Sequence, residues 1–331
     1  MKSIYQTLLE KIPSCPSLAL ATVTVTVGST PQKQGNLALF GITGLLAGTI
    51  GGGMVENQVA GIIRNTLPLK KSAYYRFDLD KDIRAEEEAI CGGHMDILVD
   101  ADPGIHRHVF EQLLLSLQQG IAGVLITRVT IRPDYPVAIR RYWIAEQDAD
   151  SLVDESYREG EDELVFLEQV VPPPKLVIAG AGHIGKALAH LGNLLDFEVT
   201  VIDDREEYAS YANIPDADHL VVGNIGRAMG QVMKTPDTYI VILTRGHKDD
   251  AEALRACIGQ DVAYIGMIGS ARKIALMREK FITERWAIVE QWEKIHTPVG
   301  LSIHSKTIQE IAVSIAAQLI QVKNQHTARY A

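Results

Sequence analysis

Residues 175–205 decide the fold of this 331-residue chain, and they read KLVIAGAGHIGKALAHLGNLLDFEVTVIDDR. A short apolar run ends at Ala179, and a Gly-Ala-Gly-His-Ile-Gly turn follows it. A helical pattern then leads to a second apolar run, which ends at Asp203. This order of strand, glycine turn, helix, strand and acid predicts a dinucleotide-binding βαβ unit.

Each residue type in this turn suits a particular task. Gly180 lets the chain turn off the strand, Gly182 leaves room for a pyrophosphate, and Gly185 lets the helix pack on the sheet. The helix starts near His183, and the N–H groups there would face the phosphate. Asp203 stands about where a carboxylate binds a ribose hydroxyl. The alternative is a glycine turn that only packs, or that holds another phosphorylated ligand.

The composition excludes several classes of protein. A net charge of −9 argues against a general nucleic-acid binder. Only three cysteines occur, and none forms a CxxC pair, so we expect no disulfide framework and a cytoplasmic protein. No stretch stays apolar long enough to cross a bilayer, and the N-terminus has the pattern of an amphipathic helix rather than a signal peptide.

The run Pro172-Pro173-Pro174 marks the expected domain boundary, because successive prolines continue neither a helix nor a strand ladder. Residues 1–171 are predicted to form a mixed α+β domain of mostly short strands, with a linker at 172–174. Within this part, residues 18–27 read LALATVTVTV, and their Thr/Val alternation predicts a strand with one buried face. Residues 175–331 alternate strands and helices, which predicts a Rossmann-like, doubly wound parallel sheet.

Several further turns of this second domain are expected at the carboxyl ends of its strands, where ligands of open α/β sheets bind. The predicted contacts to a phosphorylated ligand from these turns are Arg205, Arg245, His247, Gly269 and Ser270. Arg272 and Lys273 stand at a helix start, where a bound anion would offset their repulsion from the helix dipole. The alternative for this pair is simple exposure to solvent.

The first domain has two candidate sites of its own. Gly51, Gly52 and Gly53 begin a predicted helix and can offer N–H donors to an anion. Glu56 lies one turn inside that helix, where a carboxylate also favours the dipole without any ligand. Cys91 is followed by two glycines that leave its sulfur accessible, so its thiolate could accept sulfur or bind a soft metal. The alternative is a small apolar filler.

Taken together, the motifs resemble the XdhC/CoxI family of xanthine dehydrogenase accessory factors. The resemblance rests on stretches spread over nearly the whole chain: GSTP at 28–31, GTIGGGMVE at 48–56, CGG at 91–93, GAGHIGKAL at 180–188, DDR at 203–205, TRGH at 244–247, GMIGSARK at 266–273 and PVGL at 298–301. The chain departs from the usual family pattern at a few positions, which are Gln32, Ser302, His304 and Ile308.

The resemblance implies a maturation chaperone rather than a turnover enzyme. Such a protein binds and protects molybdenum cofactor, in its plain molybdopterin form or a nucleotide-extended one. It assists replacement of an oxo ligand by sulfido, with a cysteine desulfurase as the sulfur source. It then delivers the cofactor to xanthine dehydrogenase or a related molybdenum hydroxylase. Cys91 would contact molybdenum or relay sulfur.

Two other functions stay open at this point. The Gly180 turn with Asp203 also suits an NAD(P)-dependent oxidoreductase, although no acid–base pair for hydride chemistry is evident. A pure interaction scaffold is the third possibility. An apolar stripe along residues 308–320, together with the strands of the first domain, could support a homodimer.

Overall fold

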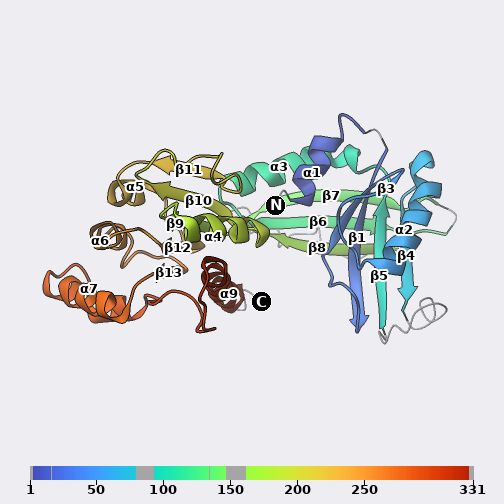
Figure 1. Cartoon of the computed structure of the whole chain (residues 1–331). Coiled ribbons are helices and arrows are strands. Elements are labelled where there is room, and N and C mark those ends of the chain that lie inside the picture. The colour runs from blue at the N-terminus through green and yellow to red at the C-terminus, as the bar shows by residue number, and fades with distance from the viewer. Residues whose placement is uncertain (1–2, 16, 80–92, 134, 147–161, 328–331) are drawn as a thin grey trace. The chain divides into compact units, whose positions relative to one another are not determined.

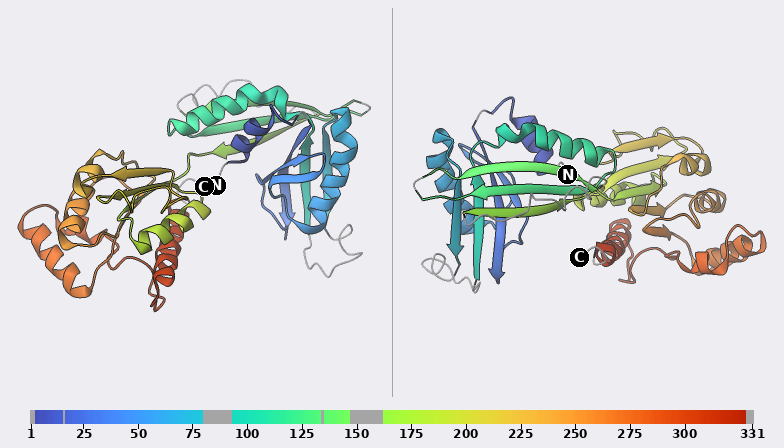
Figure 2. Two further views of the ribbon diagram at one scale, coloured as in Figure 1. Left: turned by 45° about the horizontal axis from the view of Figure 1, so that its top comes forward. Right: turned by 180° about the vertical axis from the view of Figure 1, so that it is seen from behind.

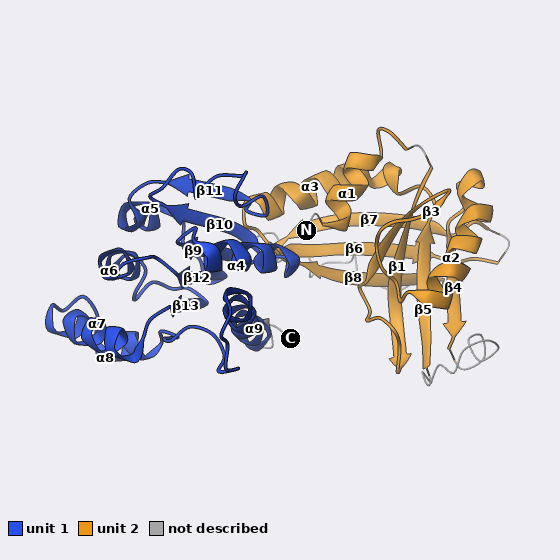
Figure 3. Cartoon of the chain, viewed as in Figure 1, with its two compact units in different colours: residues 1, 173–331 blue, residues 2–172 orange. Residues whose placement is uncertain are grey.

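The computed structural model describes residues 3–15, 17–79, 93–133, 135–146 and 162–327. The chain forms two compact units, residues 2–172 and residues 173–331, which are coloured separately in Figure 3. Cys91 and Gly92 of the predicted CGG motif lie outside the described residues.

The N-terminal unit is built on a five-stranded antiparallel sheet with the order β3-β2-β1-β5-β4. Its strands are β1 (Leu18–Gly28), β2 (Leu37–Gly41), β3 (Gly44–Gly48), β4 (Ala73–Asp78) and β5 (Gly93–Asp100). The central strand β1 is buried on both faces as far as Thr24, so the prediction of a single buried face was wrong. Thr side chains fit this interior because they can form hydrogen bonds; Thr24 donates one to the carbonyl of Asp96.

Helices cover both faces of this sheet (Figures 1 and 2). Helix α2 (Gly53–Thr66) packs one face with Val55, Val59 and Ile63. The opposite face contacts α1 (Ile4–Lys11) and α3 (Arg107–Gln118). A three-stranded antiparallel sheet, β7-β6-β8, completes this side. Its strands are β6 (Gly123–Thr130), β7 (Ala138–Ala145) and β8 (Glu163–Val170), and two short 3₁₀ turns lie at η1 (Leu67–Leu69) and η2 (Pro103–His106).

The C-terminal unit contains the predicted parallel, doubly wound sheet, with the order β11-β10-β9-β12-β13. Its strands are β9 (Lys175–Ala179), β10 (Glu198–Asp203), β11 (His219–Val222), β12 (Thr238–Ile242) and β13 (Tyr264–Met267). The three central strands consist mostly of buried Val, Ile, Leu and Ala, as expected for a sheet covered on both faces. The Rossmann-like fold class is confirmed.

Two helices pack on one face of this sheet and the others on the opposite face (Figure 1). The first face carries α4 (His183–Leu194) and α9 (Ile308–Thr327), which pack against each other. The second face carries α5 (Ile225–Gln231), α6 (His247–Arg255), α7 (Ala271–Thr283) and α8 (Val289–Glu293). No helix in the described part of the chain has the length and apolarity that a membrane span requires.

Candidate functional site

The carboxyl ends of three neighbouring strands bring together the motifs of the C-terminal unit. Strand β9 lies between β10 and β12, and the connections leave it in opposite directions on its two sides. This is the topological switch point at which open α/β sheets bind their ligands. The glycine turn after β9, the Asp-Asp-Arg stretch at the end of β10 and the Thr-Arg-Gly-His turn after β12 all lie there.

At two of its positions the glycine turn packs too closely against backbone atoms to leave room for a side chain. Gly180 has φ 118°, and a Cβ on it would lie 2.5 Å from the carbonyl oxygen of Leu243. A Cβ on Gly185 would lie 2.0 Å from the carbonyl oxygen of Gly180. By contrast, no heavy atom lies within 4 Å of the Cβ position of Gly182, the N-cap of α4. The turn is therefore tight on its packed side and open at the start of the helix.

Asp203 holds this turn in place rather than standing free at the edge of the sheet. Its Oδ2 accepts the Ala181 N–H at 2.8 Å, and its two oxygens accept Arg205 Nε at 2.8 Å and a terminal Arg205 nitrogen at 3.0 Å. Burial raises the pKa of this carboxyl, but the hydrogen bonds from Arg205 and Ala181 outweigh that effect and hold the pKa below its usual value. The side chain of Asp203 is only 3% exposed.

Arg205 and Arg245 continue this network toward solvent. The Arg205 guanidinium lies 3.5 Å from the ring centre of Tyr208, and Arg245 pairs with Asp204 at 3.1 Å. Arg245 keeps 59% of its side chain exposed, so it can move to meet an anion. His247 begins α6 and lines a groove between α6 and α7.

Sequence reasoning missed Asp250, which is fully buried and joins two of the predicted motifs. It accepts a hydrogen bond from Thr244 Oγ1 at 2.6 Å and pairs with Lys273 Nζ. Lys273 is therefore neutralised by a carboxylate of the protein, which neither prediction for it foresaw. The available signal was the position of Asp250 on the apolar face of α6, in register with Ala253 and Leu254.

Gly269 and Ser270 lie between β13 and α7. Ser270 is the N-cap of α7, and its hydroxyl accepts the Lys273 N–H at 3.3 Å. A Cβ on Gly269 would come within 3.1 Å of the Ile274 side chain. Both residues thus have a local packing or capping role that explains their identity, and their contact with a ligand stays a prediction.

Two motifs of the N-terminal unit and Gly93, the one described residue of a third, meet at one end of its larger sheet. Gly28 of the GSTP motif pairs directly with Gly93, the last residue of the CGG motif. Pro31 of the same motif lies 3.0 Å from where a Cβ of Gly51 would be. The structure thus brings Gly93 together with the GSTP and GTIGGG motifs around a short stretch of β1, a proximity that their separation in sequence does not reveal.

Glu56 bonds back to its own glycine loop. Its Oε1 accepts Thr49 Oγ1 at 2.6 Å, the Gly52 N–H at 3.0 Å and the Ile50 N–H at 3.2 Å. Burial raises the pKa of Glu56, but these three hydrogen bonds outweigh that effect and lower the pKa below its usual value. Donors that the sequence offered to an anion are therefore partly used by a carboxylate of the chain itself.

Models of two protein domains match this chain. The model described as the XdhC Rossmann domain matches residues 176–319, and the model described as the XdhC and CoxI family matches residues 16–78. The chain belongs to the XdhC/CoxI family. The resemblance that the motifs suggested is thereby confirmed.

Individual relatives of this XdhC/CoxI member are distant in sequence. An uncharacterized Escherichia coli protein, YqeB, is 27% identical over 94% of this chain, which spans 44% of the length of that relative. A Bacillus subtilis protein described as a probable xanthine dehydrogenase subunit is 25% identical, and the alignment covers 92% of each chain. A crystal structure described as a xanthine dehydrogenase from Bacillus halodurans shares the fold, with a TM-score of 0.77 at 22% identity over 96% of this chain and 95% of that one.

The predicted site residues of this XdhC/CoxI member lie in both units. Within the described ranges no group of three or more His, Cys, Asp or Glu side chains is arranged to hold a metal ion. A role for Cys91 as a molybdenum contact or sulfur relay stays a prediction, because the residue lies outside those ranges.

Proposed function

We propose that the chain is a molybdenum-cofactor-binding accessory protein. In this proposal it protects the cofactor, assists its sulfuration and delivers it to xanthine dehydrogenase or a related molybdenum hydroxylase. The observation that carries the proposal is the open start of α4 at Gly182, next to a turn that Asp203 fixes from its buried side. Membership of the XdhC/CoxI family and the name of the Bacillus subtilis relative support it.

The phosphate of the cofactor fits this turn on physical grounds. N–H groups in the first turn of a helix have no partner within the helix, and the helix dipole favours an anion there. At α4 these groups follow Gly182, where the missing Cβ leaves space for phosphate oxygens. Arg245, largely exposed and within reach of the same edge of the sheet, would add a positive charge to the phosphate site.

The remaining parts of the proposal concern sulfur and partners. The bound group would supply a molybdenum centre that accepts a sulfido ligand, and Cys91 is the thiol that the sequence places in a glycine-flanked setting. A cysteine desulfurase would donate the sulfur, and the hydroxylase would receive the finished cofactor. A homodimer stays part of the prediction, although the apolar stripe of α9 does not supply its interface, because most of that stripe is buried within the C-terminal unit.

Retention of the cofactor tests the proposal directly. The purified chain is incubated with molybdenum cofactor, separated by gel filtration and assayed for molybdenum and pterin. We expect stoichiometric retention by the wild type and at least tenfold weaker binding by Gly182→Ala, because a methyl group would fill the space at the helix start. Gly230→Ala is the matched control, since a Cβ there also meets no atom within 4 Å but lies on α5. Failure of the wild type to retain the cofactor would overturn the carrier function.

Transfer and sulfuration need a second experiment. The loaded chain is mixed with cofactor-free hydroxylase, a cysteine desulfurase and cysteine, and the appearance of hydroxylase activity is followed. We expect Cys91→Ala to retain the cofactor but to yield less sulfurated, active hydroxylase. Equal yields from Cys91→Ala and the wild type would remove Cys91 from the mechanism and leave the carrier function standing.

An NAD(P)-dependent oxidoreductase is the alternative that this fold keeps open. To bind a ribose hydroxyl, Asp203 would have to share a carboxylate already engaged with Ala181 and Arg205. We therefore expect NAD and NADP to bind much more weakly than molybdenum cofactor. Calorimetric titration with both nucleotides checks this, and a tight complex with either one would favour the oxidoreductase.

A further inference from the structure

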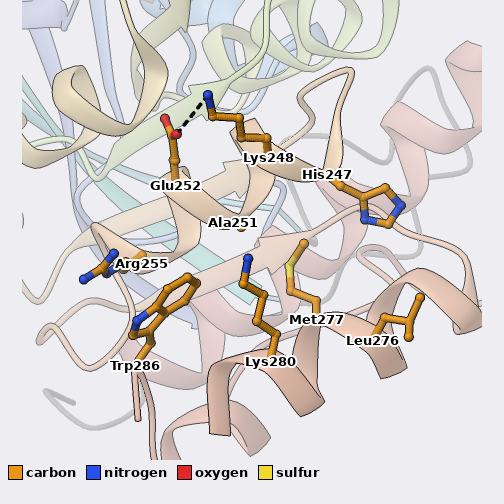
Figure 4. A pocket seen from close by; sticks show the side chains of 9 residues that line it. All are labelled: His247, Lys248, Ala251, Glu252, Arg255, Leu276, Met277, Lys280 and Trp286. Atoms are coloured by element: carbon orange, nitrogen blue, oxygen red, sulfur yellow. Dashed lines mark ion pairs between the residues drawn. The ribbon is translucent and has the colours of Figure 1, made fainter. Parts of the chain in front are cut away.

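A groove of about 510 Å³ runs between α6 and α7 on the outer side of the C-terminal unit (Figure 4). Helix α6 lines it with residues spaced along one face, from His247 to Arg255. Helix α7 contributes Leu276, Met277 and Lys280, and Trp286 closes one end. The volume lies within the range of roughly 300–1,000 Å³ that is typical of small-molecule sites.

The apolar part of the lining consists of Ala251, Leu276, Met277 and Trp286. Met277 is only 5% exposed, whereas Leu276 keeps 54% of its surface exposed at the rim. The Trp286 ring packs edge-on against buried Phe281, with 5.3 Å between the ring centres. A rigid indole beside a buried methionine provides a flat surface on which an apolar ring can pack.

Two cations lie beside this indole, and no carboxylate in the described part of the chain forms an ion pair with either of them. The Arg255 guanidinium lies 4.5 Å and Lys280 Nζ 5.0 Å from the centre of the Trp286 ring. Among the described residues, neither of them forms an ion pair. The charged pair that does line the groove is Lys248 with Glu252, at 3.9 Å. Since like charges repel, this end of the groove would gain stability from an anion.

We propose that the α6–α7 groove binds a small organic anion that has a flat apolar body and one carboxylate, phosphate or sulfonate group. The apolar body packs on Met277 and the Trp286 indole, and the anionic group pairs with Arg255 and Lys280. The site goes beyond the proposed cofactor function, because none of these four residues belongs to the glycine turn at α4. A positive groove on a chain of net charge −9 is a specific local feature rather than a general property of its surface.

The test uses anilinonaphthalene sulfonate, a fluorescent probe of this chemistry, with the full chain. We expect one probe molecule per chain and about tenfold weaker binding to the double variant Arg255→Ala/Lys280→Ala. The matched control is Arg278→Ala/Lys294→Ala, which removes the same charge from exposed positions of the same unit that do not line the groove. The control should bind the probe as the wild type does.

A neutral probe separates charge recognition from simple apolar contact. Phenylnaphthylamine has the same ring system without the sulfonate, and we expect it to bind at least tenfold more weakly than the sulfonate. Equal binding of both probes, or unchanged sulfonate binding by Arg255→Ala/Lys280→Ala, would overturn the proposal. Because both arginine and lysine side chains are exposed, their loss should leave circular dichroism and molybdenum-cofactor retention unchanged, so this test and that of the carrier function fail independently.

Discussion

The two glycine loops of this protein are each tied to a carboxylate, but in different ways. In the N-terminal unit, Glu56 follows its loop by one helical turn and accepts two of the loop's own N–H groups. In the C-terminal unit, Asp203 comes from the neighbouring strand and accepts only the Ala181 N–H of the turn, while Arg205 neutralises it. Glu56 thus uses N–H groups that its loop would offer to a ligand, whereas Asp203 supports its turn from the buried side.

This difference decides which loop is free to bind an anion. At Gly51–Gly53 an incoming anion would meet the negative charge of Glu56 and would compete with it for N–H donors. At Gly180–Gly185 the carboxylate is buried and paired, and the start of α4 faces open space at Gly182. Two similar glycine-rich sequences therefore differ in structure: one forms a closed loop, and the other has the open helix start that we propose as the phosphate site.

The largest effect should come from a methyl group at Gly185. A Cβ there would lie 2.0 Å from the Gly180 carbonyl oxygen, which is backbone and cannot yield easily. We expect Gly185→Ala to lower the free energy of unfolding by about 3 kcal/mol. Gly182→Ala, with no atom near the new methyl group, should stay within about 0.5 kcal/mol of the wild type. Chemical denaturation measures both, and equal losses would contradict the proposed division between the packed and open sides of the turn.

Removal of the carboxylate behind the C-terminal turn should have the next largest effect. Asp203→Ala leaves the Ala181 N–H and the Arg205 guanidinium without their acceptor, and we expect a loss of about 2 kcal/mol in the free energy of unfolding. The neighbouring Asp204→Ala removes an exposed ion pair with Arg245, and should cost less than about 0.5 kcal/mol. The same denaturation curves compare them. A similar loss from both variants would argue against Asp203 as the buried support of the turn.

Removal of the Glu56 carboxylate, which accepts the N–H groups of Ile50 and Gly52, should cost less stability, because these donors are nearer to solvent. We expect Glu56→Ala to lower the free energy of unfolding by about 1 kcal/mol. Asn57→Ala, at the exposed next position of α2, provides the control and should be nearly neutral. If Glu56 instead blocks an anion site, phosphate binding to Glu56→Ala will be stronger than to the wild type, and calorimetric titration with inorganic phosphate detects that gain.

The smallest effect concerns pH. The pKa of Glu56 is lower in the folded chain than its usual value, so its contribution to stability is present above the unfolded pKa and is lost as pH falls through the folded one. For a glutamate this loss should occur below about pH 4. Thermal unfolding at a series of pH values should therefore show a shallower acid-side decline for Glu56→Gln than for the wild type. Parallel curves would show that the Glu56 hydrogen bonds do not depend on its charge.

Most of the C-terminal fold was predictable because its signals are local. The apolar run that ends at Ala179 became β9, and the second apolar run, which ends at Asp203, became β10. Predictions failed where local signals compete. The short helix α8 went unrecognised, because its five residues carry too little periodicity.

The sequence of α9 shows where prediction from one chain segment ends. Its apolar stripe must be buried against another apolar surface, and a second copy of the chain was one candidate. The structure buries Ala312, Ile315 and Leu319, with Ile315 and Leu319 packed against the sheet and α4 of the same unit. The amphipathic period determines that a face must be covered, but only the arrangement of the whole unit determines what covers it.

By itself, the sequence determined the family, the Rossmann-like class of the C-terminal unit and the glycine turn at Gly180–Gly185. These follow from short-range patterns of glycine, charge and hydrophobic period, which few folds can satisfy together. Only the tertiary structure decided that Asp203 accepts hydrogen bonds from Arg205 and Ala181 and that Asp250 neutralises Lys273. It also decided that Arg255 and Lys280 both lie against the Trp286 ring. Such pairings join residues from different elements, so their energies depend on distances that exist only once the sheet and helices have packed.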